Sequence, residues 1–284
     1  MRALAIVLLI ASPAVARAQA PGETPESSPA TASAPPALDA IDVAGHQPLG
    51  ERAFFTGTAL TAPSGTVEVS GRILDDHNEG YLVDIAIGLA RGTELWLETG
   101  VTPSAIGPTP FSQDQGTYDT QAIGLEQVIA RGSHWQLAAE ASLRRSHPTL
   151  YFAPTTTMTL SNGAEPQAAP GADYVVAGTL YGTVCFDLRC RVAMTAAATL
   201  VDDLSSSTGT VSVFSASANV GGDHLRGLAE VLATPDQPSG TIRSMLLLGA
   251  RYGWTHLAIE GGFAFGTDDD DTGTSLLLGM SARL

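Results

Sequence analysis

The sequence predicts an all-β protein: an antiparallel up-and-down β-barrel of about 12 strands, preceded by a signal peptide and a disordered linker. Two observations predict the barrel. Apolar and polar residues alternate with period two over many segments of roughly ten residues, which is the pattern of strands with one apolar face. Short and long connections also alternate along the chain, as they do when strands run up and down around a barrel.

Residues 1–18 form the predicted signal peptide. Met1 and Arg2 give a short positive start, an unbroken apolar run covers 3–11, and Ala16-Arg17-Ala18 has the small-x-small pattern of a cleavage site. A buried N-terminal helix is the alternative, but the run is short and lies at the extreme terminus. Neither cysteine is near the cleavage site. We therefore expect export as a non-lipidated protein.

Residues 19–50 form the predicted linker. This segment holds six prolines among Ala, Ser, Thr and Glu, and such a composition cannot bury enough apolar surface to offset the entropy of ordering. The remaining residues, 51–284, form the predicted β-barrel domain.

Within this domain the alternation is clearest in Tyr81, Val83, Ile85, Ile87 and Leu89, with Asp84, Ala86 and Gly88 on the opposite face. Tight turns are expected at 91–92, 131–133, 186–189, 221–223 and 251–253, with longer links between them. An even strand count places both ends of the barrel at the tight-turn side. Strands are expected near 66–74, 80–90, 93–103, 117–130, 134–145, 174–186, 190–202, 210–220, 224–234, 241–250, 254–267 and 274–284.

A membrane environment fits this pattern, because a closed barrel has no open edge and pairs all its backbone groups within lipid. Trp135, Phe186 and Trp254 lie beside tight turns, while Tyr81 and Phe265 lie at the other strand ends. Aromatic residues of membrane barrels form girdles at the two interfaces. A soluble β-sandwich is the alternative fold, since its strands also alternate.

The chain resembles the outer-membrane β-barrel proteins of Gram-negative bacteria over roughly residues 52–284. The likeness rests on the alternating loop lengths and on a final strand whose apolar positions run from 276 to Leu284. Members of that family usually end in an aromatic residue, and this chain departs from them there. The segment 52–59 is also similar to one near the start of some uncharacterised barrel-like proteins. The resemblance implies a location in the cell outer membrane, with the lipid bilayer as the main partner.

Charge narrows the function. The 14 basic residues are all arginines and face 29 acidic residues, for a net charge of −15, which argues against nucleic-acid binding. Folding the alternation into a barrel directs one set of charges into the lumen. These predicted lumen-lining residues are Glu68, Arg72, Asp84, Glu94, Glu98, Glu126, Glu140, Arg144, Arg226, Glu230, Arg243 and Glu260, with Arg283 on the same face.

Two interpretations of that set stay open. In the first, the charges form a salt-bridge network that fills a plugged lumen. In the second, they line a hydrated pore, which is weakly cation-preferring because eight carboxylates outnumber five arginines. Side chains just fill the interior of an eight-stranded barrel, whereas a sixteen-stranded barrel leaves an aqueous channel. A count of twelve strands therefore does not decide between a plugged lumen and a pore.

Other candidate sites are weaker. Asp268, Asp270 and Thr272 match the first half of a calcium loop, but Gly279 stands where its glutamate belongs. A solvated acidic loop is the favoured interpretation, with low-affinity divalent-cation binding as the alternative. Cys185 and Cys190 flank a tight turn, where an oxidising compartment favours a structural disulfide.

We find no catalytic motif, and we expect neither enzymatic activity nor a cofactor. The expected function is a structural element of the outer membrane or a small, weakly cation-preferring pore. A secreted or periplasmic soluble β-rich binding protein is the alternative, and an outer-membrane barrel hydrolase is a remote one. The solute and the oligomeric state are not indicated by the sequence.

Overall fold

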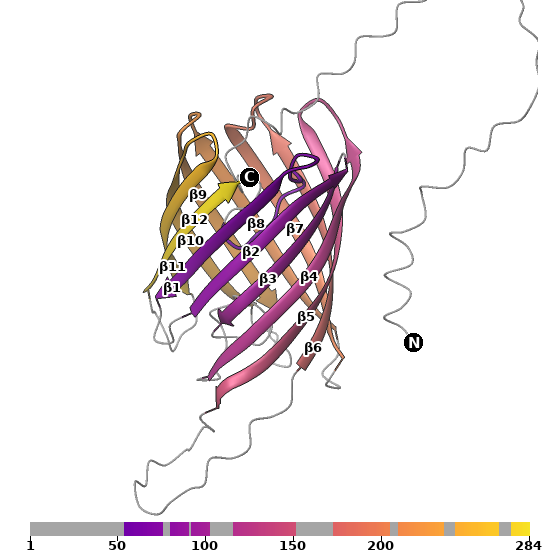
Figure 1. Ribbon diagram of the computed structural model, residues 1–284, viewed down its shortest axis with the longest axis vertical. Coiled ribbons are helices and arrows are strands. Elements are labelled where there is room, and N and C mark those ends of the chain that lie inside the picture. Colours follow the sequence, from indigo (N-terminus) through magenta and orange to yellow (C-terminus); the bar gives the residue numbers. More distant parts are fainter. Residues whose placement is uncertain are drawn as a thin grey trace, which may run out of the picture.

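The protein is a closed antiparallel barrel of twelve strands (Figure 1). The computed structural model describes residues 54–75, 80–90, 92–102, 116–151, 173–204, 210–235, 242–266 and 274–284. The strands are β1 (Val67–Asp75), β2 (Gly80–Ala90), β3 (Thr93–Thr102), β4 (Gly116–Arg131), β5 (Trp135–Tyr151), β6 (Asp173–Cys185), β7 (Val192–Asp203), β8 (Thr210–Gly221), β9 (Leu225–Pro235), β10 (Ile242–Gly253), β11 (Leu257–Gly266) and β12 (Thr274–Arg283).

Each strand pairs with its neighbours in sequence, and the seam is closed by β1 and β12. At the seam, Leu284 N donates to Val67 O at 2.8 Å. The tight turns, the start of β1 and the end of β12 lie at the same end of the barrel, which we call the turn end; the opposite end is the loop end. The predicted fold class is confirmed, and the strand boundaries differ most from the prediction at two places.

The first difference is at the loop end of β4 and β5, where the pairing continues to Gly116 and Tyr151. Polar residues such as Arg145 and His147 end the apolar alternation there, while the backbone ladder continues. The second is β10, which runs through 251–253 where a tight turn was expected; the turn follows at 254–256. Because both faces of β10 carry apolar residues, the period-two alternation that marks a strand is not visible in its sequence.

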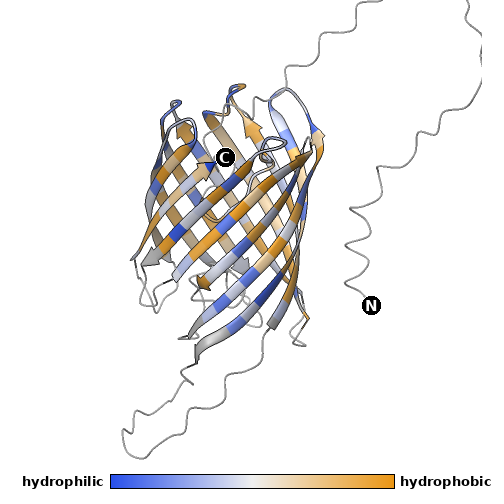
Figure 2. Cartoon of the chain, viewed as in Figure 1, coloured by the Kyte–Doolittle hydropathy of each residue, from blue (hydrophilic) through white to orange (hydrophobic). Residues whose placement is uncertain are grey.

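The outer surface of the barrel is apolar. Ile73, Leu125, Leu180, Phe214 and Met280 are each at least 40% exposed, whereas acidic and basic side chains on the alternate positions are buried. Figure 2 shows the resulting alternation of hydrophobic and hydrophilic residues along the strands. This reversal of the usual burial pattern is what a strand needs when lipid covers one face. Among the described residues, no helix is long and apolar enough to cross a membrane.

The turn between β6 and β7 carries the disulfide. Cys185 and Cys190 are bonded, with their Cα atoms 4.7 Å apart, as the sequence predicted. Cys190 has a φ of 46°, a left-handed conformation that costs free energy outside glycine. Arg191 closes the turn, donating from its backbone N and Nε to Asp187. Partial burial opposes the ionisation of Asp187, but these hydrogen bonds outweigh it and hold the pKa of its carboxyl below the usual value.

We expect thiol labelling of unreduced, denatured protein to modify neither cysteine. Replacing both cysteines by serine should lower the free energy of unfolding by about 2 kcal/mol or less, because so short a loop constrains the unfolded chain only modestly. The same labelling after reduction, with both thiols modified, is the control. Reaction of both thiols before reduction would contradict the disulfide.

Candidate functional site

The lumen contains a segment that precedes the barrel wall, residues 54–62, which we call the lumen strap. It makes hydrogen bonds to β9, β6 and β3, three strands that are not neighbours in the barrel. The strap therefore crosses the interior rather than following the wall. Phe54, Ala59 and Leu60 in the strap are at most 2% exposed.

The first anchor of the lumen strap is the carboxylate of Glu230 on β9. The backbone N–H groups of Phe54 and Phe55 donate to its Oε2 at 2.9 and 3.0 Å. The backbone N–H of Thr56 donates to Oε1 at 2.6 Å, and the Thr56 hydroxyl donates to the same oxygen. Three consecutive backbone groups thus converge on one side chain that is fully buried. Hydrogen bonds from N–H to a carboxylate are stronger than neutral ones.

Two further anchors fix the other end of the lumen strap. Ala59 N donates to Thr183 Oγ1 on β6 at 2.9 Å, and Ala62 N donates to Glu94 Oε2 on β3 at 2.6 Å. Leu60 packs against the disulfide at the turn end. The chain then leaves the lumen through Gly65, whose N donates to Gly88 O at 2.7 Å.

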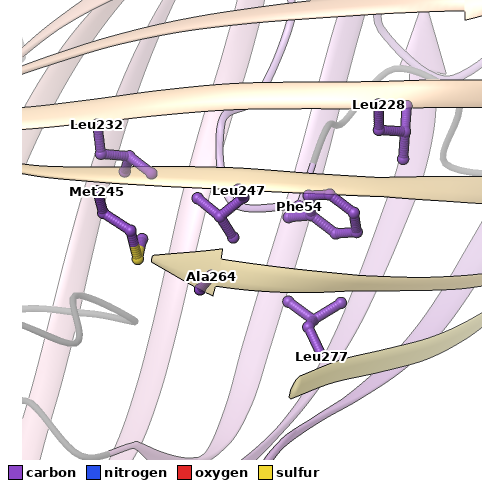
Figure 3. Packing of buried hydrophobic residues seen from close by; sticks show 7 residues of the cluster. All are labelled: Phe54, Leu228, Leu232, Met245, Leu247, Ala264 and Leu277. Atoms are coloured by element: carbon purple, nitrogen blue, oxygen red, sulfur yellow. The ribbon is translucent and has the colours of Figure 1, made fainter. Parts of the chain in front are cut away.

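Phe54 fills an apolar pocket on β9 to β12. Figure 3 shows its ring among Leu228, Leu247 and Leu277, with Leu232, Met245 and Ala264 completing the cluster. The pocket exists because Gly249 and Gly262 lie under the ring. A Cβ added at either glycine would lie 2.5 or 2.7 Å from Phe54 Cζ, so a larger residue would displace the ring.

A buried ion-pair network spans β1, β2, β10 and β11. Glu260 accepts hydrogen bonds from Arg72 Nε at 3.1 Å and from Arg251 Nε at 2.9 Å, and Arg72 Nη1 lies 3.0 Å from Asp84 Oδ2. Gly279 stands between Arg72 and Glu260 in the register. A Cβ there would lie 2.7 Å from Glu260 Cγ, so its absence lets Glu260 cross β12.

Two simpler pairs and one acidic row complete the charged wall. Arg283 pairs with Glu68 across the seam, and Arg144 Nη1 lies 2.8 Å from Glu98 Oε1. The acidic row consists of Glu94, Glu126 and Glu140, which are register partners across β3, β4 and β5. Glu140 accepts a hydrogen bond from the Tyr181 hydroxyl at 3.0 Å.

Most of the predicted lumen-lining residues have described side chains, and these are largely buried. The structure brings Arg72, Asp84 and Glu260 together, and separately Arg144 and Glu98. Arg226 is also buried, and its Nε donates to Gly222 O. The side chain of Arg243 and the loop with Asp268, Asp270 and Thr272 lie outside the described residues. Within the described part, no three His, Cys, Asp or Glu side chains are placed to hold a metal ion.

Sequence reasoning missed two parts of this site. Arg251 was assigned to a turn, yet its side chain is 2% exposed and bonded to Glu260. Counting back by twos along β10 from Arg251 through Gly249 to Leu247 would have put it on the inner face. The lumen strap was missed because its small and hydroxylated residues show no period, and its role depends on backbone donors.

The comparison with solved structures supports the barrel fold. No family model and no curated protein matches this sequence. Among solved structures, the chain is similar to the KdgM porin, with a TM-score of 0.53, 9% sequence identity, and coverage of 76% of this chain and 98% of the porin. It is also similar to the NanC porin, with a TM-score of 0.47, 10% identity, and coverage of 77% of this chain and 100% of the porin. For Omp33 of Acinetobacter baumannii the TM-score is 0.44 and the identity 12%, with coverage of 77% of this chain and 98% of Omp33. With its apolar outer surface, the fold is that of an outer-membrane β-barrel.

Proposed function

We propose that the protein is a small, weakly cation-preferring pore of the outer membrane whose lumen is narrowed by the lumen strap. One observation carries this proposal: the charge of the inner wall. Among the described side chains that face inward, eight carboxylates stand against five arginines, a balance of −3. Low-dielectric walls strengthen such a field and raise the local concentration of cations.

The excess negative charge is concentrated on one side. Glu94, Glu126 and Glu140 occupy neighbouring strands at one level, whereas the arginines of β1, β10 and β12 each face a carboxylate. A cation that passes along β3 to β5 therefore meets carboxylates, and an anion is repelled by the same row. The KdgM porin, whose fold this chain shares, is a pore according to its name, so the fold is compatible with a conducting lumen.

A structural, non-conducting role is the second candidate. It is favoured by the lumen strap, because Phe54 and Leu60 pack inside the barrel as core residues do. The two candidates differ in one measurable property, the conductance of the full-length protein in a bilayer.

Reconstitution of the full-length protein in a planar bilayer under a KCl gradient should give small conductance steps and a reversal potential on the cation-selective side. Glu126→Gln should move that potential toward zero, since it removes one of the three charges in the acidic row. Asp223→Asn is the matched control, because Asp223 is exposed at a tight turn beside Arg189 and should leave selectivity unchanged. Anion preference would contradict the proposal, and the absence of conductance would favour the structural role.

A further inference from the structure

We propose that the inner wall of the barrel is a peptide-binding site and that the lumen strap is its intramolecular ligand. The site recognises an extended segment through consecutive backbone N–H groups and through one aromatic side chain. This inference goes beyond the proposed pore function and does not depend on ion selectivity.

The carboxylate of Glu230 is dedicated to the lumen strap. All the hydrogen bonds that the described residues make to Glu230 come from Phe54, Phe55 and Thr56. Two other buried acids of the wall, Glu260 and Glu68, are paired instead with arginines of the wall itself. A buried carboxylate without hydrogen-bond partners is strongly disfavoured. Glu230 in this wall is therefore explained by the bound segment and by no other described contact.

The side chains of the lumen strap fit matching spaces. Gly249 and Gly262 make room for the ring of Phe54, as described above. On β6, the reverse holds: Gly57 of the strap lies against the ring of Tyr181, and a Cβ at Gly57 would lie 3.0 Å from Tyr181 Cζ. The wall thus has glycines where the strap has a large side chain, and the strap has a glycine where the wall has a large side chain. Such complementarity is a property of specific binding sites.

The barrel wall is complete without the lumen strap. The ring of twelve strands closes through strand-to-strand pairs alone, including β1 with β12. The strap is joined to β1 by residues 63–66, of which Ser64 and Gly65 are exposed. A cut at this junction after folding would convert the strap from a covalent part of the chain into a bound peptide.

The test uses full-length protein with a protease recognition sequence inserted between Ser64 and Gly65. After folding in detergent and cleavage, we expect the N-terminal fragment to remain with the barrel during gel filtration. With Glu230→Gln, we expect release at least tenfold faster, because the side chain loses its charge and presents donors to the strap N–H groups. Glu98→Gln is the matched control: it removes a lumen carboxylate that pairs with Arg144, and release should stay at the unmodified rate.

A second measurement asks whether binding is reversible. A synthetic, fluorescently labelled peptide of residues 52–63 should bind a barrel from which the fragment has been washed, and an excess of unlabelled peptide should displace it. The same peptide with Phe54→Ala should bind at least tenfold more weakly. If Glu230→Gln does not fold, Thr56→Val replaces it; by losing only the hydroxyl donor, it should speed release several-fold.

The proposal is overturned if the fragment leaves the unmodified barrel as fast as the Glu230→Gln barrel, or if the peptide fails to rebind while the barrel stays folded. Folding is checked by heat-dependent migration on a gel. Neither readout requires conduction, so a barrel that retains the fragment but carries no current would contradict the proposed pore and leave the peptide site intact.

Discussion

Replacement of Glu260 by glutamine is expected to lower the free energy of unfolding by about 3–5 kcal/mol, the range measured when one partner of a buried ion pair is removed. Glu260 is the carboxylate between Arg72 and Arg251, and all three side chains are at most 7% exposed. Glutamine keeps the shape and loses the charge, which removes the carboxylate shared by Arg72 on β1 and Arg251 on β10. Denaturant unfolding in lipid vesicles, monitored by tryptophan fluorescence, measures the change.

Glu98→Gln is the control for this prediction, because it makes the same chemical change at a more hydrated pair. Its partner Arg144 is 16% exposed at the side chain, so solvent screens the loss and the destabilisation should be clearly smaller. Equal effects of the two substitutions would show that the Glu260 network is as hydrated as the Arg144 pair, contrary to the burial described here.

Phe54→Ala is expected to destabilise the protein by about 3–5 kcal/mol, the usual cost of removing a large aromatic side chain from a packed core. The ring is fully buried among leucines of β9, β10 and β12, and the glycines beneath it cannot move in to fill the space. Phe55→Ala is the comparison, since Phe55 is only partly buried against the same cluster. The same vesicle unfolding experiment measures both variants. A smaller loss of unfolding free energy for Phe54→Ala than for Phe55→Ala would contradict the burial of the Phe54 ring in this pocket.

The strands could be predicted because lipid and lumen impose opposite requirements on successive residues. Where both faces of a strand were apolar, as in β10, or both were polar, as at the loop end of β5, the period was lost and the boundary was misplaced. The charged residues of the wall could be proposed from the same alternation. Their partners could not, because pairing across β12 depends on strand register and on the missing side chain of Gly279.

The lumen strap was beyond sequence reasoning for a different physical reason. A carboxylate that binds backbone N–H groups recognises atoms that every residue except proline carries. The sequence Phe54 to Thr56 therefore holds no mark of its contact with Glu230, which is 174 to 176 positions away in the chain. Only the aromatic ring and the glycine at 57 give a local signal, and neither shows where the segment binds.

The spacing of the three anchors has a mechanical consequence. Thr183, Glu94 and Glu230 lie on β6, β3 and β9, every third strand of a twelve-strand ring. A chain tied at such points acts as a cross-brace. When the circular section of the barrel is squeezed toward an ellipse, the distances between the anchors change, and hydrogen bonds of 2.6–2.9 Å resist that change. Lateral pressure from the surrounding lipid is therefore opposed by the chain inside the barrel as well as by the wall.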